Sequence, residues 1–150
     1  FDFPRPMINS KNFDFSFSGL KTAVIYLVKG LTPQYPKPLK LTGKNIADLC
    51  ASFEQAVVDV LVSKTLRAAS KLNPNTLVLG GGVAANKKLR ETLELKFKTD
   101  FPHVSCLLSP VNMTGDNALM IALAALAEYK LFKPLKNLAD LKAEANLRLE

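Results

Sequence analysis

The sequence predicts an α/β fold with a mixed or parallel sheet and packed helices. Two short apolar segments, residues 77–79 and 104–108, have the composition of buried strands. A helical pattern from residue 84 to about residue 98 separates them. This strand–helix–strand order is typical of parallel strands joined by right-handed crossovers. Three glycines, at positions 80, 81 and 82, supply the tight turn between the first strand and the helix.

The first part of the chain predicts a strand, a helix and a connector. Residues 13–18 alternate strictly between apolar and polar side chains, which predicts a strand whose three phenylalanines share one face in the core. Residues 20–29 follow as a helix that ends near Gly30. Prolines at positions 33, 36 and 38 make the next segment short and stiff.

A long helix is predicted over residues 43–72, because apolar side chains recur there every three to four positions. Thr42 is placed to cap its N-terminus, and Pro74 cannot continue the helix. The apolar stripe comprises Ile46, Leu49, Phe53, Val57, Val60 and Leu61.

The last predicted helix begins at Asp116 and ends near residue 131, after Ser109 and Pro110 have ended the second strand. It is rich in alanine, and these small side chains predict close packing against a neighbouring element. Thr114 or Asp116 is predicted to cap its N-terminus. Residues 138–150 are polar with scattered leucines and are interpreted as a short helix or an extended tail.

Length and composition limit the class of protein. The chain has 150 residues, enough for one domain with a core, and its 48% hydrophobic and 22% charged residues are usual for soluble globular proteins. No apolar run reaches the roughly 20 residues that cross a bilayer, and no secretory leader is visible. The chain begins at Phe1 without an initiator Met, which suggests a fragment of a longer protein.

Charge and cysteine usage favour a cytoplasmic protein with a polyanionic partner. The net charge is +7, which attracts polyanions. Cys50 and Cys106 lie far apart in apolar surroundings, and we interpret them as buried free thiols in a reducing compartment. A disulfide between them is the less favoured alternative.

The glycine turn and the helix after it carry the first candidate chemistry. Backbone N–H groups at such a turn can face a nucleotide or another anion; the alternative is a turn that serves packing alone. Residues 80–85 nominally match Gly-x-Gly-x-x-Ala, but no acidic residue ends the next strand, since Asp100 lies before it, and this argues against a dinucleotide site. Lys87, Lys88 and Arg90 occupy the first turns of the helix, where cations indicate either a bound anion or a solvated basic face.

Asp116 is the candidate metal ligand. Its carboxylate follows a predicted strand in the chain, where open α/β sheets bind ligands, and it is a hard oxygen donor; the alternative is a helix cap. His103 is the only histidine, so the residues of this chain cannot complete a transition-metal site, and we expect His103 at the surface or a strand edge.

Three segments together resemble a known family. They are residues 12–22 (Asn-Phe-Asp-Phe-Ser-Phe-Ser-Gly-Leu-Lys-Thr), residues 80–90 with the glycine turn, and residues 114–122 (Thr-Gly-Asp-Asn-Ala-Leu-Met-Ile-Ala). In order and approximate spacing they are similar to the C-terminal half of the tRNA threonylcarbamoyladenosine-modification transferases, called TsaD in bacteria and formerly glycoproteases. Residues 4–7 and 53–59 match family segments too, so the resemblance covers nearly the whole chain.

The resemblance implies an actin-like ATPase (ribonuclease H-like) fold, of which residues 1–150 form mainly the second lobe as a single domain. It implies transfer of threonylcarbamoyl from its adenylate to the adenosine beside the anticodon, with other subunits of the modification complex as partners. By motif, Asn86, Gly81 and Gly82 would bind ATP or the adenylate, and Asp116 would bind one divalent metal, iron or zinc. No catalytic residue is carried over, and the isolated lobe is expected to self-associate.

The chain also departs from the family pattern. The His-x-x-x-His motif that supplies the family's metal histidines is absent from this chain, and Gly115 stands where the family more often has Thr. The chain alone is therefore expected to be inactive. The alternative is a non-catalytic nucleotide-binding or assembly lobe that scaffolds the modification complex. The historical peptidase activity finds no support, since the chain lacks His-Glu-x-x-His.

Overall fold

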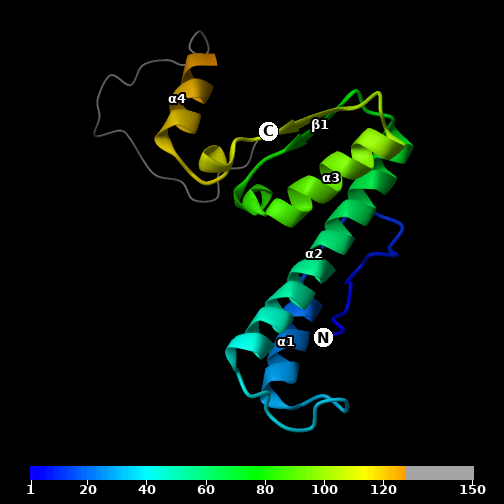
Figure 1. The fold of residues 1–150 in the computed structure, drawn as a ribbon. Helices are drawn as coiled ribbons and strands as arrows, with labels where there is room; N and C mark the ends of the chain where they lie inside the picture. Colours follow the sequence, from blue (N-terminus) through cyan, green and yellow to red (C-terminus); the bar gives the residue numbers. More distant parts are fainter. Residues whose placement is uncertain (128–150) are drawn as a thin grey trace, which may run out of the picture. The chain divides into compact units, whose positions relative to one another are not determined.

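A computed structural model describes residues 1–127 of the chain (Figure 1). The chain divides into two compact units, Phe1–Thr114 and Gly115–Glu150. The end of the last predicted helix and the predicted tail at residues 138–150 lie outside the described residues. No helix of the described residues is long and apolar enough to cross a membrane.

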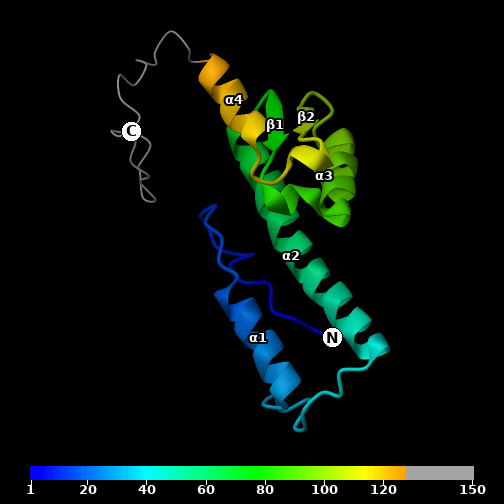
Figure 2. The same ribbon diagram turned by 90° about the vertical axis from the view of Figure 1, so that its left-hand side faces the viewer.

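The first unit is organised along one long helix, α2 (Gly43–Leu72), whose bounds are those predicted (Figure 2). The Thr42 hydroxyl accepts a hydrogen bond from the backbone N–H of Asn45 at 3.4 Å, which confirms Thr42 as the N-cap. Asn73 ends the helix in the left-handed conformation, with φ +45°, and Pro74 follows. Helix α1 (Ser18–Lys29) lies beside the N-terminal half of α2 (Figures 1 and 2).

Two strands and one helix form a small α/β layer at the other end of α2. Strands β1 (Thr76–Leu79) and β2 (Ser105–Leu108) pair in parallel, and helix α3 (Lys87–Asp100) connects them. The register sets Val78 opposite Leu107. This arrangement confirms the predicted α/β class with a parallel sheet.

The hydrophobic core is divided between the two ends of α2. One cluster joins α1 to α2 and the N-terminal segment, and its buried members are Phe3, Leu20, Leu27 and Ala56. The other joins α2, α3 and one face of the sheet, and its buried members are Val58, Val62, Ala69, Leu89, Leu93, Phe97 and Val104. The predicted stripe of α2 is mostly buried or half-buried, with Ile46 as the exposed exception.

The predicted strand at residues 13–18 is wrong. The described residues contain no strand there, and α1 already begins at Ser18. A strand needs a neighbour to accept its ladder of hydrogen bonds, and side-chain alternation supplies none. The alternation does place the Phe15 and Phe17 rings on one side, where they stack with centroids 6.5 Å apart, but Phe15 remains 48% exposed.

The helix predicted from residue 84 is divided in two. A short 3₁₀ helix, η1 (Gly82–Ala85), comes first, and α3 begins only at Lys87. Asn86 separates them because its backbone is extended, with ψ 115°, and its side chain caps α3.

The prediction of two buried free cysteines is confirmed only in part. Both are free, so the alternative of a disulfide is wrong, but Cys50 is exposed rather than buried. Cys106 is half-buried on β2. Desolvation, and secondarily the charge of Glu94, raises the pKa of the Cys106 thiol.

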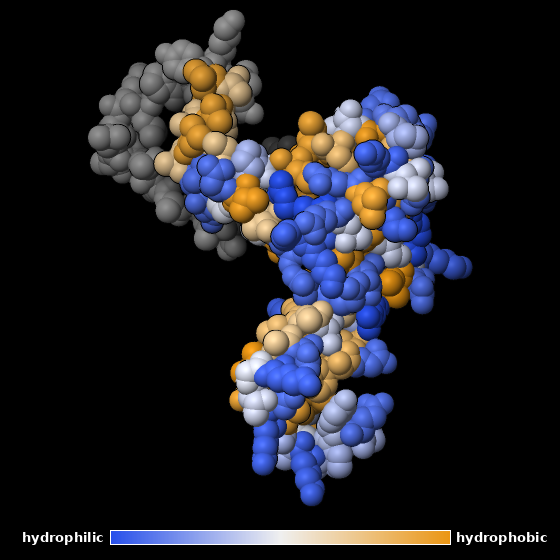
Figure 3. Space-filling model, viewed as in Figure 1, coloured by the Kyte–Doolittle hydropathy of each residue, from blue (hydrophilic) through white to orange (hydrophobic). Residues whose placement is uncertain are grey.

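The second unit contains helix α4 (Ala118–Ala127) within its described part. Its N-terminus is capped by Asn117, whose Oδ1 accepts a hydrogen bond from the Met120 N–H at 2.8 Å. The prediction of Thr114 or Asp116 as the cap is therefore wrong; the Thr114 hydroxyl donates to the Val111 carbonyl instead. Every residue of α4 is exposed, so the close packing predicted for its alanines is not found among the described residues. Figure 3 shows apolar side chains of α4 on the face in view.

Candidate functional site

The candidate site is built at the carboxyl ends of the two parallel strands, where open α/β sheets bind ligands. After β1 the chain turns through three glycines into η1, and after β2 it continues through Ser109 and Pro110 into η2 (Val111–Met113). The Ser109 N–H donates to the Leu79 carbonyl at 3.1 Å, which carries the strand pairing into the loop.

Arg90 ties these two loops together. Its Nη1 donates to the Ala84 carbonyl and to the Ser109 carbonyl, both at 2.9 Å. Lys87, by contrast, forms only an exposed ion pair with Glu91 at 3.7 Å. Arg90 and Lys87 therefore need no bound anion to explain their positions, since Arg90 is engaged by protein carbonyls and Lys87 lies on a solvated face.

The glycine turn is open above its second and third residues. Gly81 has φ +82°, a conformation that side chains with a Cβ adopt only with strain. No heavy atom lies within 4 Å of the position a Cβ would take at Gly81 or Gly82, whereas at Gly80 the Ser109 Oγ lies 3.5 Å away. Gly81 is thus required by the backbone, and the described residues show no packing contact at Gly81 or Gly82 that a Cβ would disturb.

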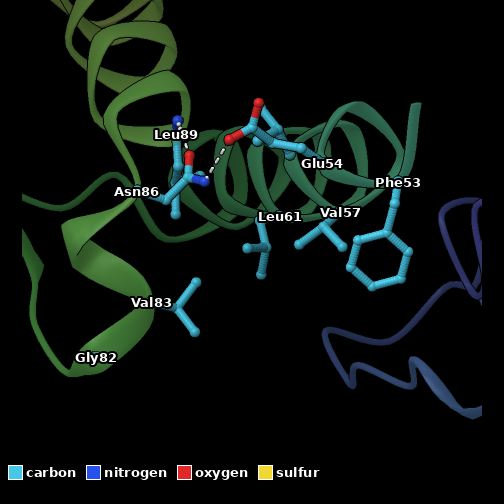
Figure 4. A pocket seen from close by; sticks show the side chains of 9 residues that line it. Phe53, Glu54, Val57, Leu61, Gly82, Val83, Asn86 and Leu89 are labelled. Carbon is cyan, nitrogen blue, oxygen red and sulfur yellow. Dashed lines mark hydrogen bonds between the residues drawn. The ribbon is translucent and has the colours of Figure 1, made fainter. Parts of the chain in front are cut away.

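Asn86 makes two hydrogen bonds through its side-chain amide (Figure 4). Oδ1 accepts from the Leu89 N–H at 2.8 Å, which is the N-cap of α3. Nδ2 donates to Glu54 Oε1 on α2 at 2.7 Å. One N–H and one lone pair of the amide remain for another partner.

A hollow of about 330 Å³ lies between α2 and the turn that precedes α3. Figure 4 shows its apolar wall, to which α2 contributes Phe53, Val57 and Leu61 and η1 contributes Val83. Glu54 and Asn86 supply its charged and amide groups. An apolar hollow with a few convergent polar groups suits a small molecule with a flat apolar body and hydrogen-bonding edges.

The structure brings two of the four predicted site residues to this hollow. Gly82 and Asn86 line it, and Gly81 precedes Gly82 in the turn. Asp116 belongs to the second unit, where its side chain is exposed. Within residues 1–127, no three His, Cys, Asp or Glu side chains gather in a group that could hold a metal ion.

His103 is exposed, as predicted, with Nε2 3.1 Å from Asn73 Oδ1. Glu54 was missed as a candidate. Its signal is a carboxylate placed on the apolar stripe of a helix, next to Phe53 and three residues before Val57.

Comparisons with known proteins identify the family. A sequence model of the tRNA N6-adenosine threonylcarbamoyltransferases (TsaD) matches residues 1–123. The chain is 43% identical to the tRNA N6-adenosine threonylcarbamoyltransferase of Thermosipho africanus, covering 99% of this chain and 42% of that protein. It is 42% identical to the Listeria welshimeri protein of the same name, over 100% of this chain and 41% of the relative, and 45% identical to the Streptococcus pneumoniae one, over 86% and 35%. The chain thus spans about two-fifths of the length of these relatives, and it belongs to the tRNA N6-adenosine threonylcarbamoyltransferase family.

Proposed function

We propose that this chain is the nucleotide-binding part of an enzyme that transfers a threonylcarbamoyl group from its adenylate to the N6 amine of an adenosine in tRNA, beside the anticodon. Family membership over residues 1–123 is the observation that carries this proposal. In such a transfer the amine nitrogen bonds to the carbamoyl carbon, AMP departs, and the amine loses a proton. The net charge of +7 suits a polyanionic tRNA substrate, and the cytoplasm is the proposed compartment of the activity.

In this proposal, the hollow beside the glycine turn receives the adenosine part of ATP or of the adenylate. Gly81 and Gly82 allow the ligand to approach the backbone, because the space above them is open. The remaining amide N–H and lone pair of Asn86 make the directional contacts. The apolar wall of α2 covers the flat face of the base.

Asp116 is proposed as one ligand of the family's divalent metal, iron or zinc. Its side chain is exposed, so its carboxylate is accessible to a metal ion and to further ligands of that ion. A tightly held transition metal needs three or four ligands, and the described residues assemble no such group. We therefore assign no step of the reaction to the metal.

Asn86→Ser in the intact protein tests the assignment of the hollow. Serine also caps helices, so α3 keeps its N-terminal hydrogen bond while the amide is lost. We expect ATP affinity to fall about tenfold, measured by calorimetric titration, with the melting temperature close to that of the wild type. Asn86→Ala is the matched variant and should lose both affinity and stability, because the cap goes too. Undiminished ATP binding by Asn86→Ser would show that Asn86 serves only the helix.

The activity itself is tested with threonylcarbamoyl-adenylate and unmodified tRNA. The intact protein, with its partner subunits, should modify the tRNA. Residues 1–150 alone should not, since Asp116 is their single proposed metal ligand and no catalytic group is assigned to them. Modified tRNA from the isolated chain would overturn that expectation.

A second candidate is a non-catalytic lobe that binds nucleotide and scaffolds the modification complex. The exposed apolar side chains of α4 favour it, because an apolar helix surface that is not covered by the described residues is available for assembly. An intact protein that binds ATP and its partner subunits but leaves tRNA unmodified would select this alternative.

A further inference from the structure

Glu54 places a carboxylate in an otherwise apolar part of the hollow. It is half-buried on α2 beside Phe53 and Val57. None of the three ion pairs found in residues 1–127 includes it. Its hydrogen bond within the described part of the chain is the one from Asn86 Nδ2, at 2.7 Å. Placing a carboxylate against apolar side chains costs free energy unless it is hydrogen-bonded, so the contact with Asn86 stabilises Glu54 in the hollow.

The contact orients the Asn86 amide in one way. A carboxylate can only accept, so the nitrogen of the amide must face Glu54, and a backbone N–H can only donate, so the oxygen must face Leu89. Turning the amide over would lose both hydrogen bonds at once. The hydrogen bond from Leu89 fixes the position of the amide oxygen, and the hydrogen bond to Glu54 fixes the orientation of the amide plane. The unused N–H and lone pair of Asn86 are thereby held in a set orientation.

The same contact joins two parts of the chain that are 32 residues apart in sequence. Glu54 lies on α2, whereas Asn86 lies at the junction between η1 and α3, directly after the glycine turn. We propose that Glu54 is a positioning residue for the nucleotide: it sets the Asn86 amide in the orientation that binds the ligand. This inference rests on the ligand-binding role proposed above for Asn86.

The test compares four further variants with the wild type and with Asn86→Ser, in the intact protein, titrated with ATP well below every melting transition. Glu54→Ala removes the hydrogen bond that orients the Asn86 amide and should weaken ATP binding about five- to tenfold. Glu54→Gln removes the charge but keeps a carbonyl that accepts the same hydrogen bond, so its affinity should stay within about twofold of the wild type. The double variant Glu54→Ala/Asn86→Ser should bind no more weakly than Asn86→Ser alone, because both changes remove one contact. Asp48→Ala, an exposed carboxylate on the same helix, is the charge control and should bind ATP normally.

The outcomes distinguish a positioning role of Glu54 from the ligand-binding role proposed for Asn86. If Asn86→Ser weakens ATP binding but Glu54→Ala lowers only the melting temperature, Glu54 is structural and the inference is overturned while the site assignment stands. Equal losses in Glu54→Gln and Glu54→Ala, or fully additive losses in the double variant, overturn it as well. If Asn86→Ser binds ATP normally, the site assignment fails and this inference fails with it.

Discussion

At the scale of single residues, Lys64 explains why a segment without regular structure stays in place. Its side chain is only 1% exposed, an unusual position for an ammonium group. It donates to the Ser10 hydroxyl at 2.7 Å, to the Asn12 carbonyl at 3.3 Å and to the Asp14 carbonyl. Its Nζ also lies 5.6 Å from the centre of the Phe15 ring. One cation thus satisfies a hydroxyl and two backbone carbonyls in a segment that has no strand ladder.

Lys64→Met should therefore destabilise the protein strongly. Methionine keeps most of the volume of the side chain but leaves three buried or half-buried acceptors without a donor. We expect a loss of about 3 kcal/mol in the free energy of unfolding, measured by urea titration of the intact protein. Lys71→Met is the matched control, because Lys71 is exposed and lies 5.6 Å from the Phe13 ring, and it should cost less than about 1 kcal/mol. Similar losses in the two variants would contradict this account.

The residues of the candidate site were predictable only where the signal is local. Gly81 could be predicted because a glycine run after a strand marks a turn, and Asn86 because of its place in a family motif. Glu54 could not, because its partner lies 32 positions away and no periodicity links the two. Arg90 was singled out as a cation at a helix start, but its two carbonyl partners belong to loops that only the folded sheet brings together.

At the scale of elements, two glycines next to helices have opposite requirements. Gly30 ends α1 with φ +70°, and its N–H donates to the Leu27 carbonyl at 3.2 Å. A Cβ there would overlap the Lys37 carbonyl carbon and the Pro38 nitrogen, and would lie 2.7 Å from the Lys37 Cα. Gly43 begins α2, and a Cβ there would meet no atom within 4 Å.

Alanine substitutions at these two positions should have opposite effects. Gly30→Ala should lower the free energy of unfolding by more than about 2 kcal/mol, since the backbone of the connector has to move and the left-handed conformation is strained. Gly43→Ala should raise the free energy of unfolding by about 0.5 to 1 kcal/mol, because alanine reduces the conformational freedom of the unfolded chain and is favourable in a helix. Thermal unfolding of both variants beside the wild type measures this. Destabilisation by Gly43→Ala would contradict the open space around the Cβ position at Gly43.

The elements also show which parts of the fold a single sequence predicts. The bounds of α2 were predicted because all its signals are local: apolar periodicity, a capping Thr42 and a terminating Pro74. Local apolar runs also predicted the two strands, with one bound of each differing by one residue, and the intervening helix predicted their parallel order. The strand at residues 13–18 failed because pairing depends on a neighbour, which a local pattern cannot report. The start of α3 was placed too early because apolar residues at 83 to 85 continue the helical pattern into η1.

At the scale of the molecule, each of the two units leaves apolar surface uncovered. In the first unit, Val78 and Leu107 lie opposite each other on the face of the sheet away from α3, and they are 68% and 56% exposed. Parallel sheets are normally covered on both faces, so this face lacks a layer within the described residues. In the second unit, α4 carries five exposed large apolar side chains, namely Leu119, Met120, Ile121, Leu123 and Leu126.

These uncovered surfaces predict that the isolated 150-residue chain self-associates. Apolar patches of this kind are buried against a partner when one is available, and a second copy is the partner present in a purified sample. At micromolar concentrations, we expect sedimentation velocity to show dimers or larger species. Leu126→Glu should shift the distribution towards the monomer, because Leu126 is 71% exposed and a charge there opposes burial. Thr99→Glu adds the same charge to an exposed polar position on α3 and should leave the association unchanged. A chain that sediments as a monomer throughout this range, or one whose association Leu126→Glu leaves intact, would show that α4 does not drive contact between copies.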